Sequence, residues 1–242
     1  MPARRKMRCL CKGICPMKYP YLLFDADNTL FNFDRANREA FHAVCERFDI
    51  PENDETFALY ERCNNEMWAA FDRGECTKEF LVVQRFRNFL AAMGLDRDAE
   101  GCNALHLHTL SQCAFVLPYA EEVCHTLARG HKLYLVTNAV ASVQRGRLAK
   151  SPIAPAITAA FISEEAGAAK PSAAYFDYVF DHIDGITKDN CLVIGDSISS
   201  DIRGANNYGL PCCWYNPKHA PRPADIRIDY EIDDLRQLYD IV

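Results

Sequence analysis

The sequence lacks three features: an excess of basic residues, a long apolar run and a dense set of cysteines. Its 242 residues include 27 Lys and Arg against 33 Asp and Glu, so the formal net charge is −6. We therefore expect no nucleic acid polymer as a partner, because clustered basic side chains hold a phosphate backbone. No segment approaches the roughly 18 consecutive apolar residues that cross a membrane, so the sequence predicts no contact with a membrane.

The 12 cysteines are spread over the whole chain, whereas a disulfide framework needs a much higher density. We expect reduced thiols and a cytoplasmic location. Cys9, Cys11 and Cys15 lie close together, but three thiols without a nearby fourth ligand do not complete a zinc site. We predict that residues 1–18 form a flexible extension without a catalytic role, since polar and helix-breaking residues interrupt the apolar stretch that a signal peptide needs.

Short apolar runs alternate with helical patterns over much of the remaining chain, which is 49% hydrophobic and long enough to bury a core. The runs that predict buried parallel strands are 21–24, 132–138, 160–163, 191–196 and 211–215. Helical patterns at 118–128, 172–180 and 199–208 lie between them. This alternation predicts the α/β class, with a doubly wound, Rossmann-like parallel sheet whose ligand site lies beyond the carboxyl ends of its strands.

Residues 34–117 interrupt the alternation. They contain helical periodicities, such as Phe41, Val44 and Phe48, but no convincing strand. We therefore predict an inserted all-helical cap at 34–117, with the α/β core made of residues 19–33 and 118–242. Because the insertion follows the first strand directly, it should lie near the active edge of the sheet, where it can close over a ligand and exclude water.

The segment FDADNTLF places Asp25 and Asp27 two residues apart, just after the first predicted strand. One carboxylate can attack a substrate while the other transfers protons, provided that both face one site. An Asp pair at this position also suits an ordinary turn. The pair therefore indicates a catalytic site only if other polar residues converge on it.

Other polar residues do follow the later predicted strands. Thr137 and Asn138 end one strand and can offer a hydroxyl and a backbone N–H to phosphate oxygens. Lys170 precedes a predicted helix, where its ammonium can offset charge on a transferring group. Asp196 ends a strand and Asp201 follows five residues later, and such hard oxygen ligands suit Mg²⁺.

The segments FDADNTLF, LVTNA, AKP and IGDSISSDIRGA resemble the four successive signature motifs of the haloacid dehalogenase-like hydrolases, over residues 24–205. This resemblance implies that Asp25 is the nucleophile that forms an aspartyl-phosphate. It also implies that Asp27 protonates the leaving oxygen and then activates water, and that Thr137 and Lys170 bind the phosphate. Dehalogenases of the superfamily lack an acid at the position of Asp27, so the sequence resembles a phosphatase or mutase.

The same resemblance implies a magnesium cofactor. Its ligands would be Asp25, the backbone carbonyl of Asp27 and Asp196, with Asp201 as a ligand or an orienting acid. A dianionic phosphate would repel the attacking carboxylate unless a divalent cation and Lys170 neutralised the site.

The predicted cap and the C-terminal tail resemble the pyrimidine 5′-nucleotidase branch, which acts on nucleoside monophosphates. We therefore expect a small phosphate ester as substrate. Trp68 and Arg85 are candidate specificity residues, and the neighbouring side chains considered with them are Phe71, Arg73 and Phe86. Such residues can stack on or hydrogen-bond a base, although the same spacing also suits helix packing. The alternatives are a phosphatase of small sugar phosphates or phosphoglycolate, and a catalytically silent binding module.

Overall fold

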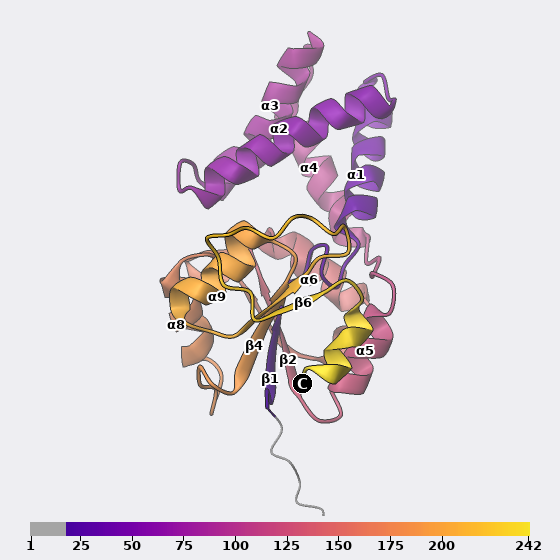
Figure 1. Ribbon diagram of the computed structural model, residues 1–242. Helices are drawn as coiled ribbons and strands as arrows, with labels where there is room; N and C mark the ends of the chain where they lie inside the picture. Colours follow the sequence, from indigo (N-terminus) through magenta and orange to yellow (C-terminus); the bar gives the residue numbers. More distant parts are fainter. Residues whose placement is uncertain (1–17) are drawn as a thin grey trace, which may run out of the picture.

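The structure is a computed structural model that describes residues 18–242 (Figure 1). The predicted N-terminal extension and its three cysteines lie outside the described residues, apart from Lys18. In the described chain, one parallel sheet has the strand order β3-β2-β1-β4-β5-β6. Its strands are β1 (Tyr21–Phe24), β2 (Lys132–Thr137), β3 (Ile157–Ile162), β4 (Cys191–Gly195), β5 (Cys212–Tyr215) and β6 (Tyr230–Ile232).

Helices cover both faces of the sheet, which confirms the prediction of a doubly wound α/β core. Successive residues of a strand point to opposite faces, so Leu22 and Phe24 pack on one side and Leu23 on the other. The first side is covered by α5 (Ala120–Leu127) and a 3₁₀-helical turn at Leu235–Asp240. The second side is covered by α8 (Ala173–Asp181) and α9 (Arg203–Tyr208).

Four helices are inserted between β1 and α5, as the sequence predicts, and Figure 1 shows them above the sheet, beyond the carboxyl ends of its strands. Their bounds are α1 (Phe33–Phe48), α2 (Asp54–Asp72), α3 (Lys78–Met93) and α4 (Ala99–Gln112). Asn53, Thr77 and Asp98 each accept a hydrogen bond from the first turn of the helix that follows. We refer to α1–α4 as the helical insertion.

The insertion has its own core, which is rich in aromatic residues. Phe41 stacks on Tyr60 with 4.8 Å between ring centroids, and Phe86 and Phe89 pack around the same tyrosine. All four side chains are fully buried. The periodic apolar positions of 34–117 therefore serve mainly to hold the four helices together.

The insertion contacts the core through α6 (Ala141–Lys150), a helix that the sequence patterns did not predict. Gly146 of α6 lies so close to α4 that a Cβ there would be 2.8 Å from the backbone oxygen of Ser111. Only glycine permits this approach of the two helices. The contact joins the insertion to the segment from β2 to α6, which also contains the predicted site residues Thr137 and Asn138.

Two further observations concern the described chain. No helix within residues 18–242 combines the length and the apolar character needed to cross a membrane. The cysteines of this part of the chain form no disulfide with one another.

Candidate active site

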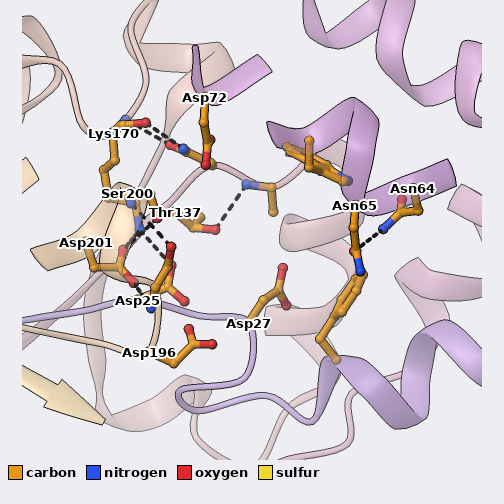
Figure 2. A pocket seen from close by; sticks show the side chains of 15 residues that line it. Asp25, Asp27, Asn64, Asn65, Asp72, Thr137, Lys170, Asp196, Ser200 and Asp201 are labelled. Atoms are coloured by element: carbon orange, nitrogen blue, oxygen red, sulfur yellow. Dashed lines mark hydrogen bonds and ion pairs between the residues drawn. The ribbon is translucent and has the colours of Figure 1, made fainter. Parts of the chain in front are cut away.

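Three neighbouring strands, β2, β1 and β4, direct polar side chains into one pocket of about 230 Å³ (Figure 2). Asp25 follows β1, Thr137 ends β2 and Asp196 follows β4. The N–H of Asp25 donates to the carbonyl of Ile194 at 2.8 Å, which extends the pairing of β1 with β4 and fixes the position of Asp25. The predicted site residues that line this pocket are Asp25, Asp27, Trp68, Thr137, Asn138, Lys170, Asp196 and Asp201.

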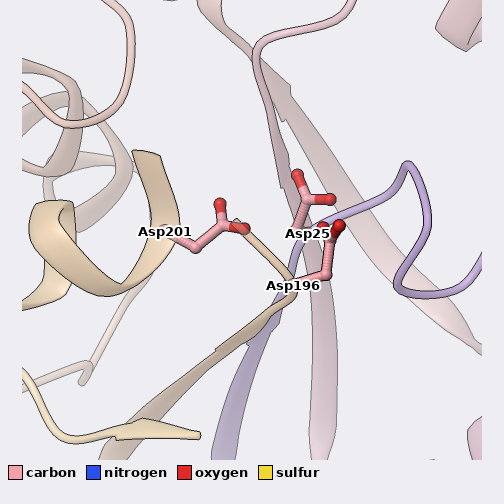
Figure 3. A group of neighbouring side chains, drawn as sticks. All are labelled: Asp25, Asp196 and Asp201. Carbon is pink, nitrogen blue, oxygen red and sulfur yellow. The ribbon is translucent and has the colours of Figure 1, made fainter. Parts of the chain in front are cut away.

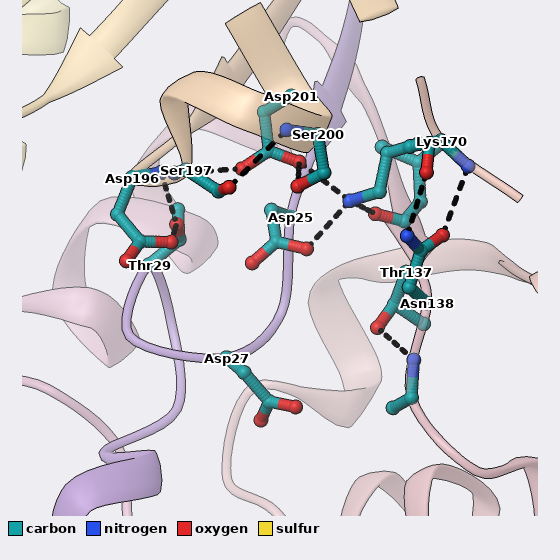
Figure 4. A network of polar contacts seen from close by, with 12 residues as sticks. Asp25, Asp27, Thr29, Thr137, Asn138, Lys170, Asp196, Ser197, Ser200 and Asp201 are labelled. Carbon is teal, nitrogen blue, oxygen red and sulfur yellow. Dashed lines mark hydrogen bonds and ion pairs between the residues drawn. The ribbon is translucent and has the colours of Figure 1, made fainter. Parts of the chain in front are cut away.

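Lys170 is the central cation of the pocket (Figure 4). Its Nζ donates to Asp25 Oδ1 at 2.7 Å, to Asp201 Oδ1 at 2.6 Å and to the carbonyl of Val136 at 2.6 Å. Burial opposes the charged amine, but the adjacent carboxylates of Asp201 and Asp25 outweigh burial and raise the pKa of Lys170 above its ordinary value. Lys170 is therefore a fixed positive charge beside Asp25.

Asn138 holds the chain at Lys170 in place. Its amide nitrogen donates to the backbone carbonyl of Lys170 at 2.9 Å, and its amide oxygen accepts from the backbone N–H of Lys170 at 3.0 Å. The side chain of Asn138 therefore supports Lys170. Thr137 Oγ1 accepts from the N–H of Ala139 at 3.1 Å and shapes the turn after β2.

Asp25, Asp196 and Asp201 form a cluster in which each offers a carboxylate oxygen within 4.8 Å of the others (Figure 3). Burial raises the pKa of Asp25 well above its usual range, with Lys170 acting in the opposite direction. Burial, reinforced by the charge of Asp201, raises the pKa of Asp196 to about 7. Buried carboxylates this close repel one another, and a divalent cation that prefers hard oxygen ligands would remove the repulsion. The donor set fits Mg²⁺.

Asp201 is placed by a π-helical turn over Ile198–Ile202. The N–H of Ser197 donates to Asp201 Oδ2 at 3.0 Å, and a Cβ at Gly195 would lie only 2.2 Å from the same oxygen. Glycine at position 195 is therefore needed for Asp201 to reach the cluster. On the other side, Thr29 Oγ1 accepts from the N–H of Asp196 at 3.1 Å.

Asp27 has a partner that the motifs did not indicate. Arg147 of α6 donates from Nη1 to Asp27 Oδ1. Arg147 is fully buried, and its guanidinium lies 4.5 Å from the ring centre of Phe31. Its Nη2 has no hydrogen-bond partner within the described residues. The pair fixes the orientation of the carboxylate that faces the pocket.

The insertion closes the pocket with one face of α2. Asn64, Asn65, Trp68 and Asp72 line the side opposite the strand ends, and Ser199 Oγ of the core donates to Asp72 Oδ2 at 3.0 Å. Sequence reasoning identified only Trp68 among these four. Counted from Asn64, the other three residues lie one, four and eight positions further along α2. This spacing places all four on one face of the helix and could have identified them.

Lys78 makes a further contact between the insertion and the core. Its buried Nζ donates to Ser163 Oγ at 2.7 Å and to the carbonyl of Ala139 at 3.1 Å, and lies 3.5 Å from Glu164. The Ala139 carbonyl belongs to the turn after Thr137. Lys78 therefore ties α3 to the loop that borders the pocket.

The remaining insertion residues considered from the sequence lie elsewhere. Arg85 lines a smaller neighbouring cavity together with Trp68 and Asp27, and it is absent from the lining of the main pocket. Phe86 is buried in the core of the insertion. Arg73 is bound to Glu75, and Phe71 packs edge-on against Trp68.

The parallel sheet and the polar residues at its strand ends can be compared with those of known protein families. A family model described as a haloacid dehalogenase-like hydrolase matches residues 19–209, and the chain belongs to this family. The predicted membership of this family is confirmed.

Individual relatives match over nearly their whole length. YfnB of Bacillus subtilis, named as a HAD-hydrolase, is 34% identical over 93% of this chain and 96% of its own. The pyrimidine 5′-nucleotidase PynA of Streptococcus pneumoniae is 31% identical, with 93% and 95% coverage. The pyrimidine 5′-nucleotidase YjjG of Escherichia coli is 28% identical, with 92% and 97% coverage.

A crystal structure of YfnB bound to magnesium superimposes on this chain with a TM-score of 0.89, covering 93% of this chain and 98% of YfnB. The family and these relatives agree with the predicted enzyme class, a phosphoric monoester hydrolase, and this prediction is confirmed.

Proposed function

We propose that this chain is a magnesium-dependent phosphatase that forms an aspartyl-phosphate on Asp25. The observation that carries the proposal is the position of Lys170, held between Asp25 and Asp201 at the carboxyl ends of the central strands. A carboxylate beside a fixed cation can approach a phosphate dianion that would otherwise repel it.

In the proposed reaction, a carboxylate oxygen of Asp25 forms a bond to phosphorus while the ester bond to the leaving oxygen breaks. Asp27 gives its proton to that oxygen and then takes a proton from water, which hydrolyses the acyl phosphate and restores Asp25. Lys170 and Thr137 bind the phosphoryl oxygens. The pocket lining contains all four side chains.

Asp25, Asp196 and Asp201, together with the backbone carbonyl of Asp27, are the groups that would hold Mg²⁺. The ion would neutralise charge on the phosphoryl group. Support comes from the carboxylate cluster of this chain and from the magnesium-bound structure of YfnB.

For the substrate, we propose a pyrimidine nucleoside monophosphate. The names of PynA and YjjG support this choice, and so do the aromatic ring of Trp68 and the amides of Asn64 and Asn65 in the pocket. In this proposal residues 34–117 act as a cap that contacts the leaving group, while residues 19–33 and 118–242 perform the phosphoryl transfer. A cytoplasmic location and the exclusion of nucleic acid polymers stay predictions from the sequence.

A substrate panel tests the proposal. We expect the highest kcat/KM for UMP and CMP, lower values for AMP, ribose 5-phosphate and phosphoglycolate, and no turnover without Mg²⁺. Asp25→Asn should abolish phosphate release with the fold intact, because an amide of similar volume cannot form the acyl phosphate. A highest value for phosphoglycolate or the sugar phosphate would instead favour the alternative substrate class. Absence of release from every ester, including phenyl phosphate, would favour a silent binding module.

A further inference from the structure

Arg85 is buried in the insertion against acceptors that are all uncharged. Its guanidinium donates to the carbonyl of Val82 at 3.0 Å, to Asn64 Oδ1 at 2.8 Å, to Asn103 Oδ1 at 3.2 Å and to His106 Nδ1 at 3.2 Å. Only 2% of the residue is exposed. A buried guanidinium without an anionic partner is costly, and an apolar side chain would fill the same space more cheaply. Packing alone therefore does not explain why an arginine occupies this position.

The guanidinium fixes the direction of the hydrogen bonds that continue from it to the pocket. An arginine side chain can only donate, so Asn64 must turn its amide oxygen toward Arg85. The amide nitrogen of Asn64 then faces Asn65 and donates to Asn65 Oδ1 at 3.4 Å. Because the amide oxygen of Asn65 accepts this bond, as the dashed line in Figure 2 marks, its amide nitrogen occupies the other branch of the same amide group.

Asn64 and Asn65 both line the pocket that contains Asp25 and Asp27. From Arg85 outward, each residue donates a hydrogen bond to the next. The group at the end of the series, Asn65 Nδ2, is therefore also a donor. We call these three residues the amide relay. Without Arg85, either amide could rotate by 180° and offer an oxygen instead.

We infer that the amide relay selects leaving groups that carry a carbonyl oxygen, with Asn65 Nδ2 as the group that binds it. The inference rests on the proposed function, since it identifies how a nucleotidase pocket would choose its base. Every pyrimidine base has a carbonyl next to the nitrogen that bears the ribose, whereas adenine has no carbonyl. A site built to donate a hydrogen bond discriminates strongly against a substrate that leaves the donor unpaired.

Two substitutions reverse the polarity of the relay without changing its size. Asn65→Asp replaces the terminal donor by an acceptor. Asn64→Asp gives Arg85 an anionic partner and leaves a second oxygen facing Asn65, whose amide then rotates and turns its own oxygen to the pocket. Because Asn64→Asp pairs a buried cation that has uncharged partners, this variant is expected to fold. Glu66→Gln, at an exposed position of the same helix, is the matched control.

The measurement is kcat/KM of the magnesium-loaded enzyme for UMP, AMP and phenyl phosphate. Both Asp variants should lower the ratio of kcat/KM for UMP to that for AMP about tenfold, the effect of about one hydrogen bond. Phenyl phosphate, which offers no carbonyl, measures any general loss that the added carboxylate causes for every ester. Glu66→Gln should match the unsubstituted chain. If UMP remains the best substrate and the ratio is unchanged in both variants, the relay does not select the base, although the nucleotidase function stands. If the unsubstituted chain prefers phosphoglycolate to both nucleotides, the proposed function fails, and the inference with it.

Discussion

Arg147 is the residue whose importance is least visible in the sequence. It belongs to no signature motif, and its buried guanidinium reaches Asp27 from a helix 120 positions further along the chain. An arginine and a carboxylate form a directional pair, so Arg147 holds Asp27 in one orientation at the pocket. In the proposed reaction this makes Arg147 a positioning residue for the proton transfer.

Arg147→Met should therefore impair esters with poor leaving groups more than esters with good ones. A positioned acid contributes roughly 10²-fold or more to proton transfer, and a nitrophenolate leaves without a proton. We expect a loss of about tenfold or more in kcat for UMP and a clearly smaller loss for p-nitrophenyl phosphate. Arg145→Met, on the same helix but exposed and bound to Glu165, is the control. Equal losses for both esters would assign Arg147 a purely structural role.

The residues at the strand ends could be placed from the sequence because a parallel sheet brings the ends of its strands together. Asp25, Thr137 and Asp196 each follow an apolar run directly, and their proximity follows from the sheet alone. The partners from outside the sheet, such as Asn65 and Arg147, could not be placed in this way. Their positions depend on how α2 and α6 pack, and no local pattern encodes this packing.

At the scale of elements, His106 connects α4 to the other three helices of the insertion. Arg85 donates to its Nδ1, so this nitrogen must be unprotonated and the ring proton resides on Nε2. Nε2 then donates to Asn37 Oδ1 at 3.0 Å, and Tyr60 OH lies 3.0 Å from the same nitrogen. A second proton on Nδ1 would face the guanidinium directly. Burial, followed by the charge of Arg85, lowers the pKa of His106 well below its usual value.

The stability of the protein should therefore fall with acid because of His106. Below about pH 6.5 an unfolded chain binds a proton on this histidine that the folded chain does not bind, and the difference is about 1.4 kcal/mol per pH unit. The contribution is fully present above pH 6.5 and is lost as the pH falls below it. His106→Gln should be less stable at pH 7.5 but lose less stability between pH 6.5 and 5.

Urea unfolding at a series of pH values measures this effect. His108→Gln, at an exposed position of α4, is the matched control and should follow the unsubstituted chain. If the slope of unfolding free energy against pH is the same in His106→Gln and the control, the acid sensitivity arises elsewhere.

The elements themselves were predictable to different degrees. Strands β1, β2 and β4 are buried on both faces and therefore read as continuous apolar runs. Helix α6 gave no such signal, because two of the side chains it buries are Gln144 and Arg147. Strand β6 has three residues and only one of them is buried, which is too short for a recognisable pattern.

At the scale of the whole molecule, negative charge is concentrated at the junction between core and insertion. The carboxylates Asp25, Asp196 and Asp201 meet there, and Asp72 of the insertion lies in the same pocket. Burial raises the pKa of Asp72, and the charge of Asp201 adds to this increase. Lys170 balances only part of this charge. Repulsion between these carboxylates therefore destabilises the metal-free protein, and a bound divalent cation should remove this destabilisation.

Mg²⁺ should consequently raise the thermal unfolding midpoint. A ligand that binds only the folded state at 100 times its Kd stabilises it by about 2.7 kcal/mol, or roughly 5–10 °C for a chain of this size. The effect of Asp196→Asn on the unfolding midpoint should have opposite signs in the metal-free and the magnesium-bound protein. Without metal the variant should melt above the unsubstituted chain, because a neutral amide ends the repulsion. With Mg²⁺ it should melt below, because a ligand is missing. Asp96→Asn, an exposed change of the same type, should leave both midpoints unchanged. Differential scanning calorimetry with EDTA and with Mg²⁺ gives all six values, and an equal magnesium shift in Asp196→Asn and the unsubstituted chain would place the ion elsewhere.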